Sequence, residues 1–250
     1  MKKILIPLPN YGFDPTECAI PYKILSEKGH EITFATPEGK TAKADSKMLF
    51  GENLGIFKNI LMARKDAVSA YHEMEISEAF KNPIKYEEAK EENFDAIFLP
   101  GGHDKGMREY LESEILQNLI SKFFEKQKPV GAICHGVVLV CRSKNSETQK
   151  SVLYDYKTTA LLKSQELLAY NMTRLWLEDY YLTYPEITVE DEVKSTLKNP
   201  ENFLKGKTPI SRDSENNLKA GFVVKDRNYV SARWPGDIYS FSLEFLKLLS

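Results

Sequence analysis

The sequence predicts an α/β protein with a mostly parallel sheet and helices on both of its faces. Short apolar runs alternate with segments of helical periodicity, which is the pattern of repeated β-α units. Strands of such units form parallel sheets that are covered on both sides. No internal repeat and no low-complexity linker interrupts the chain, so we expect one domain over residues 1–250.

The first predicted elements are a strand at Lys3–Leu8 and a helix at Pro15–Lys28, which Gly29 ends. Residues 41–92 depart from the alternation, because two helical segments follow each other there with no obvious strand between them. We expect a helical insertion over one edge of the sheet. Its helices are Met48–Met62 and Ala67–Phe80; further strands are expected at Glu31–Thr36, Asp95–Leu99, Pro129–Ile133 and Lys157–Leu162, later helices at Lys163–Tyr181, Val189–Leu197 and Ser240–Leu249, and a hairpin at Phe222–Val224 and Tyr229–Ser231.

Composition and charge exclude several classes of protein. The chain has 34 Lys and Arg against 36 Asp and Glu, so no cationic field favours nucleic acid or an anionic membrane as a partner. A hydrophobic content of 42% argues against a disordered chain. The longest apolar stretch, Val130–Cys141, is shorter than the ~20 residues of a membrane helix, and the apolar start at Ile4 is broken by prolines, unlike a signal peptide.

Three cysteines without a CxxC spacing are unsuited to a disulfide framework or a zinc site. We therefore expect a reducing compartment, the cytoplasm. His30 and His72 have no partner at ligand spacing, so no metal site is expected. Cys18 and Cys141 are interpreted as packing residues.

Cys134 stands where a buried strand runs directly into an apolar helical segment. A nucleophile at a tight strand-to-helix turn needs small residues two positions before and after it, and Ala132 and Gly136 meet that requirement. The helix N-terminus is expected to favour the thiolate over the thiol. His135 is a candidate base beside it. The alternatives are a buried structural cysteine and a histidine that faces solvent.

Two further motifs follow strands that end at the same sheet edge. In Leu99-Pro100-Gly101-Gly102-His103, paired glycines let the backbone approach a ligand and direct an N–H at developing negative charge, although such a turn is often only a connection. Glu17 follows the first strand. It either faces Cys134 or is simply an acidic residue in the first turn of a helix.

These three pieces together resemble the DJ-1/PfpI superfamily, and the adjacent Cys134 and His135 are most similar to its Hsp31-like branch. The resemblance implies a flavodoxin-like three-layer sandwich, related to class I glutamine amidotransferase domains, with a nucleophile elbow. It implies Cys134 as nucleophile, His135 as triad histidine and Glu17 as the acid on the thiol. The third triad member would be Glu166, with Glu178 and Asp179 as alternatives; the oxyanion and substrate site would comprise Gly101, Gly102, His103 and Gly136.

The resemblance also implies an activity. Members of this branch are described as glutathione-independent glyoxalases, which convert methylglyoxal to lactate, and as protein deglycases. The expected partners are therefore a small dicarbonyl or a glycated protein, and a second copy in a homodimer, with no cofactor. The alternatives are a stress chaperone or redox sensor without turnover, and a cysteine amidohydrolase or peptidase. The branch's late Gly-Gln-Asn-Pro stretch is replaced here by Ser231–Asp237, so that wall of the pocket is expected to differ.

Overall fold

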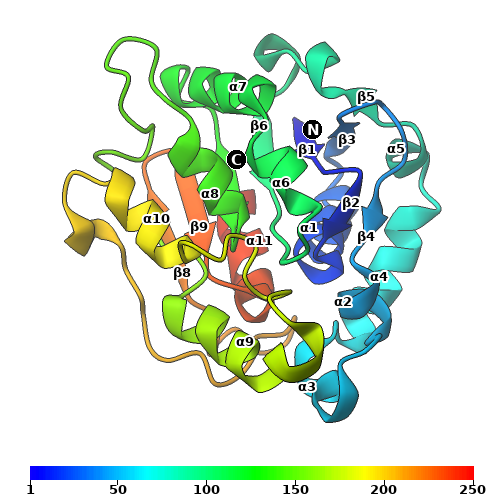
Figure 1. The fold of residues 1–250 in the computed structure, drawn as a ribbon. Coiled ribbons are helices and arrows are strands. Elements are labelled where there is room, and N and C mark those ends of the chain that lie inside the picture. The colour runs from blue at the N-terminus through cyan, green and yellow to red at the C-terminus, as the bar shows by residue number, and fades with distance from the viewer.

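A seven-stranded sheet forms the middle of the molecule in the computed structural model, which describes all residues 1–250 (Figure 1). Every neighbouring pair of strands is parallel except the last, β9 and β8, which form the predicted hairpin. The mostly parallel α/β fold is thus confirmed. The strands lie in the order β5 (Ile84–Lys85), β3 (Glu31–Thr36), β1 (Lys3–Pro7), β6 (Ala96–Leu99), β7 (Val130–Ile133), β9 (Tyr229–Ala232) and β8 (Val223–Asp226).

The helices cover both faces of this sheet. From β1 the chain passes through α1 (Pro15–Glu27) to β3 on one side, and from β6 it passes through α7 (Glu114–Glu125) to β7 on the other. Right-handed crossovers in opposite directions place the two helices on opposite faces. α11 (Ile238–Leu248) packs beside α1, and α8 (Gly136–Arg142) beside α7. The carboxyl ends of β1, β6 and β7 therefore meet where the strand order reverses, and ligands of open α/β sheets bind at such points.

Residues 41–92 differ in detail from the predicted helical insertion. Glycines with left-handed backbone, Gly51 and Gly55, divide the first expected helix, and Ser77 caps a new helix within the second. Strand β5 also lies in this segment and pairs with β3 as the edge strand of the sheet, so the segment is not wholly helical. The observed elements are β4 (Lys43–Ala44), which pairs with β2 (Tyr11–Phe13), then α2 (Ser46–Phe50), α3 (Lys58–Leu61), α4 (Lys65–Glu75) and α5 (Glu78–Lys81).

The strand predicted at Lys157–Leu162 is absent. Both edges of β9 are occupied, by β7 and β8, so this segment does not pair beside β9. It makes one isolated bridge, between Thr158 and Phe203, and Thr159 N–H donates to Ser231 Oγ at 3.0 Å. The remaining helices are α6 (Met107–Leu111), α9 (Lys163–Leu177) and α10 (Val189–Thr196), with 3₁₀ turns η1 (Gly55–Phe57), η2 (Tyr86–Glu88), η3 (Glu91–Asn93), η4 (Pro200–Asn202) and η5 (Pro235–Asp237).

None of these helices is both long enough and apolar enough to cross a bilayer.

Candidate active site

Cys134 occupies a strained turn between β7 and α8. Its φ of 57° lies in the left-handed region, which a residue other than glycine adopts rarely and at a cost. Two residues further on, only glycine fits, because a side chain at Gly136 would clash with the carbonyl oxygen of Leu99. Cys134 is 1% exposed, so it lies inside the protein at the sheet's carboxyl edge. This geometry is that of the predicted nucleophile elbow.

Glu17 reaches the same place from α1. Asp14 caps the helix by accepting from the N–H groups of Thr16 and Glu17 at 2.8 and 3.0 Å, so it is Asp14 that serves the capping role. The Glu17 carboxyl is fully buried, and its Oε2 accepts from Gly101 N–H at 2.8 Å. Glu17 lies beside the thiol, because a Cβ placed at Gly101 would be 2.7 Å from Glu17 Oε2 and 3.0 Å from Cys134 Cβ, and Glu17 Oε1 has no hydrogen-bond partner within the protein. The structure thus brings together the acid and the thiol that the sequence placed after different strands.

Burial decides the charge states of this pair. Desolvation raises the pKa of Glu17 well above its ordinary value, and the nearby Asp14 adds to the effect. Desolvation likewise raises the pKa of the Cys134 thiol well above its usual range, with Glu17 and Asp14 contributing. The expectation of a thiolate is therefore wrong for this state. The N–H of His135 favours the anion, but burial outweighs it.

Gly101 is tightly packed between Glu17, His135 and Cys134. A Cβ at this position would lie 2.7 Å from both Glu17 Oε2 and the His135 nitrogen, and 3.0 Å from Cys134 Cβ. Gly102 is equally confined, since its Cβ would lie 2.5 Å from the carbonyl oxygen of Gly12. No backbone carbonyl accepts from the N–H groups of Gly102 and His135. Both are therefore candidates to bind an oxyanion.

We expect Gly101→Ala to lower the free energy of unfolding by about 1–3 kcal/mol, because the atoms around it are backbone or buried and cannot retreat freely. Chemical denaturation of the wild type and the variant measures this difference. Gly29→Ala is the matched control: a side chain there meets nothing within 4 Å, and only the left-handed backbone opposes it. A Gly101→Ala protein as stable as the wild type would contradict this packing.

His135 lies on the other side of the thiol. Its Nδ1 is 3.5 Å from Cys134 Sγ, and its Nε2 is 3.0 Å from the hydroxyl of Thr183. The ring is fully buried, not solvent-facing, and desolvation holds its pKa well below the ordinary value. The ring of His103 packs edge-on against it at 5.0 Å between centroids. Burial likewise lowers the pKa of His103 to about 4.

None of the three carboxylates expected as third triad member is bound to His135. Glu166, in the first turn of α9, accepts instead from Val189 N–H at 3.0 Å. Asp179 pairs with Lys105 at 2.6 Å, and Glu178 follows the end of α9. The ring partner is Thr183, because the chain after α9 returns over the site six residues after that helix ends. No local pattern in the sequence distinguishes this threonine from others.

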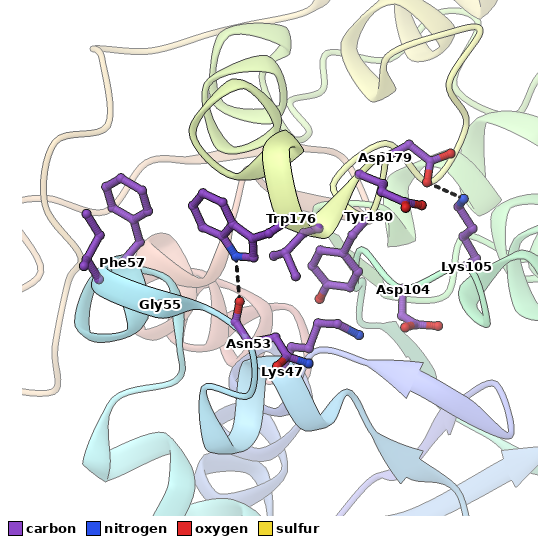
Figure 2. Close-up of a pocket in the computed structure, with 12 residues that line it drawn as sticks. Lys47, Asn53, Gly55, Phe57, Asp104, Lys105, Trp176, Asp179 and Tyr180 are labelled. Atoms are coloured by element: carbon purple, nitrogen blue, oxygen red, sulfur yellow. Dashed lines mark hydrogen bonds and ion pairs between the residues drawn. The ribbon is translucent and has the colours of Figure 1, made fainter.

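A cavity of about 890 Å³ lies beside the site but does not reach the thiol. Figure 2 shows it between the end of α9 and the segment that follows α2, with Trp176, Tyr180, Lys47 and Lys105 around it. Tyr180 lines the cavity, and Tyr181 packs behind it at 4.8 Å between ring centroids. Tyr181 in turn packs on His103 at 5.0 Å. Two tyrosines therefore stand between the cavity and the His103–His135 pair.

The other two cysteines, Cys18 and Cys141, are buried and free, as packing residues would be. No group of three or more His, Cys, Asp or Glu side chains is arranged to hold a metal ion.

A buried cysteine at a strained strand-to-helix elbow, beside a buried acid and a histidine, is an arrangement typical of α/β proteins that carry a nucleophile at such an elbow. The family model described as ThiJ/PfpI family-like matches residues 8–199, and this chain belongs to that family. The match includes Glu17, the glycine turn, Cys134 and Thr183.

The individual proteins that resemble this chain and are named below are each less than 30% identical to it. A glutathione-independent glyoxalase of Schizosaccharomyces pombe is 29% identical over 161 residues, which is 64% of this chain and 62% of that protein. A deglycase of Thermococcus kodakarensis is 27% identical over 248 residues, 99% of each chain. The solved structure of glyoxalase III from Candida albicans superposes with a TM-score of 0.68 at 19% identity, covering 99% of this chain and 97% of that one. The last likeness shows the fold alone.

Proposed function

We propose that this protein is a glutathione-independent glyoxalase or a closely related carbonyl-processing enzyme of the deglycase type, with Cys134 as its nucleophile. The observation that carries the proposal is the buried elbow cysteine between Glu17 and His135. The names of the glyoxalase and deglycase relatives support it. Its substrate would be a small 1,2-dicarbonyl such as methylglyoxal, or the carbonyl adduct on a glycated protein.

The reaction divides into three steps. The Cys134 sulfur adds to the aldehyde carbon, its proton passes to His135, and the resulting oxyanion, held by the N–H groups of Gly102 and His135, takes up a proton to give a hemithioacetal. Glu17 or His135 then moves the proton from the former aldehyde carbon to the neighbouring carbon through an enediol, giving a thioester. Water hydrolyses the thioester, which releases lactate and restores the thiol. The sum is methylglyoxal plus water to lactate, with no net oxidation.

The deciding experiment is to incubate the purified protein with methylglyoxal in the absence of glutathione and to measure the lactate formed. Lactate production in proportion to enzyme concentration is the expected result. Loss of methylglyoxal without lactate would mean trapping by surface amines or thiols and would refute the activity. The three free cysteines suit a reducing compartment, and we propose the cytoplasm as the place of action.

We infer that a substrate reaches Cys134 from the cavity when the wall formed by Tyr180 and Tyr181 moves, and two contacts hold Tyr180 in place. The Tyr180 hydroxyl donates to the buried carboxyl of Asp45, and Lys47 lies over the Tyr180 ring at 4.7 Å. Burial raises the pKa of Asp45 to about 6, so near neutral pH it is the charged acceptor of a strong hydrogen bond. Glu178 is the first residue after α9 and precedes the two tyrosines, and its φ of 49° lies in the left-handed region.

We expect Tyr180→Phe to speed the alkylation of Cys134 by iodoacetamide roughly 10-fold, because a hydrogen bond to a charged group stabilises the closed wall by about that factor. Mass spectrometry of the labelled peptide over time measures the rate. Tyr156→Phe is the matched control, since it removes a tyrosine hydroxyl that bonds Asn228, far from the cavity. Equal rates in the wild type and Tyr180→Phe would show that this contact does not limit access.

A further inference from the structure

The hydroxyl of Thr183 is bound on two sides. It donates to the carbonyl oxygen of His103 at 2.8 Å and lies 3.0 Å from His135 Nε2. The residue is fully buried, so no solvent competes for these bonds. A hydroxyl has one proton and a carbonyl can only accept, so the Thr183 proton forms the hydrogen bond to the carbonyl oxygen of His103. Towards the ring, the Thr183 oxygen can therefore only accept.

We propose that Thr183 is the positioning residue of this site: it accepts from His135 Nε2–H and thereby leaves Nδ1 bare toward the thiol of Cys134. The inference rests on the proposed function, since it assigns the base for the thiol addition described above. A neutral imidazole carries one ring proton, so a proton fixed on Nε2 makes Nδ1 the acceptor. Nδ1 is the nitrogen that lies 3.5 Å from Cys134 Sγ.

As the partner of His135, Thr183 differs from the carboxylate expected as the third member of the triad. A carboxylate stabilises the imidazolium that forms when the histidine takes a proton, whereas a threonine hydroxyl offers only a dipole. The groups that face His135 add little negative charge to compensate. They are the thiol of Cys134 and, beyond it, the carboxyl of Glu17, whose pKa burial raises, the neutral ring of His103, and the cationic Arg142, which is paired with Glu192.

The consequence concerns the substrate class. Because no resting thiolate–imidazolium pair is stabilised, the S–H proton leaves for His135 Nδ1 only as the carbon–sulfur bond forms and the carbonyl π electrons move to oxygen. Aldehydes and 1,2-dicarbonyls accept a thiol under such general-base assistance. Amides need a stronger nucleophile. The site therefore selects reactive carbonyls over peptide bonds, which disfavours the amidohydrolase and peptidase alternatives.

Three substitutions at Thr183 test the role. Thr183→Ser keeps the hydroxyl, and we expect kcat within about 3-fold of the wild type. Thr183→Val has the same shape but leaves Nε2–H without an acceptor, and we expect kcat to fall roughly 10- to 100-fold with KM nearly unchanged. Thr183→Asp supplies a carboxylate, so the acidic limb of kcat/KM should move to higher pH. Alkylation of Cys134 should also gain a component at lower pH. A Thr183→Val enzyme with the wild-type kcat and pH profile overturns the proposal.

A second measurement needs neither turnover nor a variant that folds. Nitrogen-15 NMR of the wild type with labelled histidine distinguishes the two neutral tautomers, and His135 is one of only four histidines. An Nε2–H tautomer is the expected result, and an Nδ1–H tautomer overturns the proposal. If the wild type makes no lactate, the proposed function fails. The tautomer and the alkylation profile then still decide the role of Thr183.

Discussion

Cys134→Ser is expected to reduce lactate formation from methylglyoxal by roughly 10³-fold or more, because an alcohol in this buried site is far less nucleophilic than a thiol. The protein should fold normally, since serine adds no volume and places a hydroxyl beside the Glu17 carboxyl, whose Oε1 has no hydrogen-bond partner. Steady-state kinetics, with circular dichroism as a check on folding, measures the effect.

Cys141→Ser is the matched control for this loss of activity. Cys141 lies in α8, the helix that follows Cys134, is similarly buried, and its Sγ donates to the carbonyl oxygen of Val138 at 3.2 Å, a bond that a serine hydroxyl can keep. We expect it to retain activity. Retained turnover in Cys134→Ser would remove Cys134 as the nucleophile, and equal losses in both variants would point to a structural effect.

Arg233→Met is expected to cost about 3–5 kcal/mol of stability, the largest loss that we expect from a single substitution outside the active site. Arg233 forms a two-bond pair with Asp237, Nε to Oδ2 at 2.8 Å and Nη2 to Oδ1 at 2.9 Å, and both side chains are almost completely buried. Nη1 also donates to the carbonyl oxygen of Lys207 at 2.6 Å. Removing the arginine leaves the Asp237 carboxyl buried without its counter-charge. For a chain of this length the melting temperature should fall by about 10 °C.

The pH dependence of this variant has a definite sign. Desolvation already raises the pKa of Asp237 in spite of Arg233, so without Arg233 its folded-state pKa lies further above the unfolded value. A carboxyl with a raised folded-state pKa destabilises the folded protein as the pH rises through that value. The difference in stability between Arg233→Met and the wild type should therefore become smaller as the pH falls.

Two controls separate the buried charge from other causes. The double variant Arg233→Met with Asp237→Leu should recover much of the loss, because both charges are then absent. Lys163→Met breaks an exposed pair with Asp191 and should leave the melting temperature almost unchanged. Calorimetry of the three variants tests these expectations. An Arg233→Met protein with wild-type stability would show that the buried pair contributes nothing.

The later part of the chain shows where sequence patterns fail. The run at Lys157–Leu162 has the composition of a strand, but it packs against side chains of β9, and both edges of β9 are already paired. Similarly, Glu166 has a suitable distance along the chain from Cys134 for a triad acid. Its direction in α9 takes it to the backbone of Val189 instead. Both errors arise because a local pattern does not specify which distant segment will lie beside it.

The sequence by itself determined the parallel α/β sheet, the elbow at Cys134 and the three sheet-edge motifs, because apolar periodicity, small residues at fixed offsets and glycine pairs act over a few neighbouring residues. Only the tertiary structure decided the charge states and the partner of His135. Burial raises the pKa of Cys134 and Glu17, and burial is a property of the whole fold. Thr183 reaches the ring from 48 residues away in the sequence, and that contact depends on where α9 and the segment after it lie in the fold.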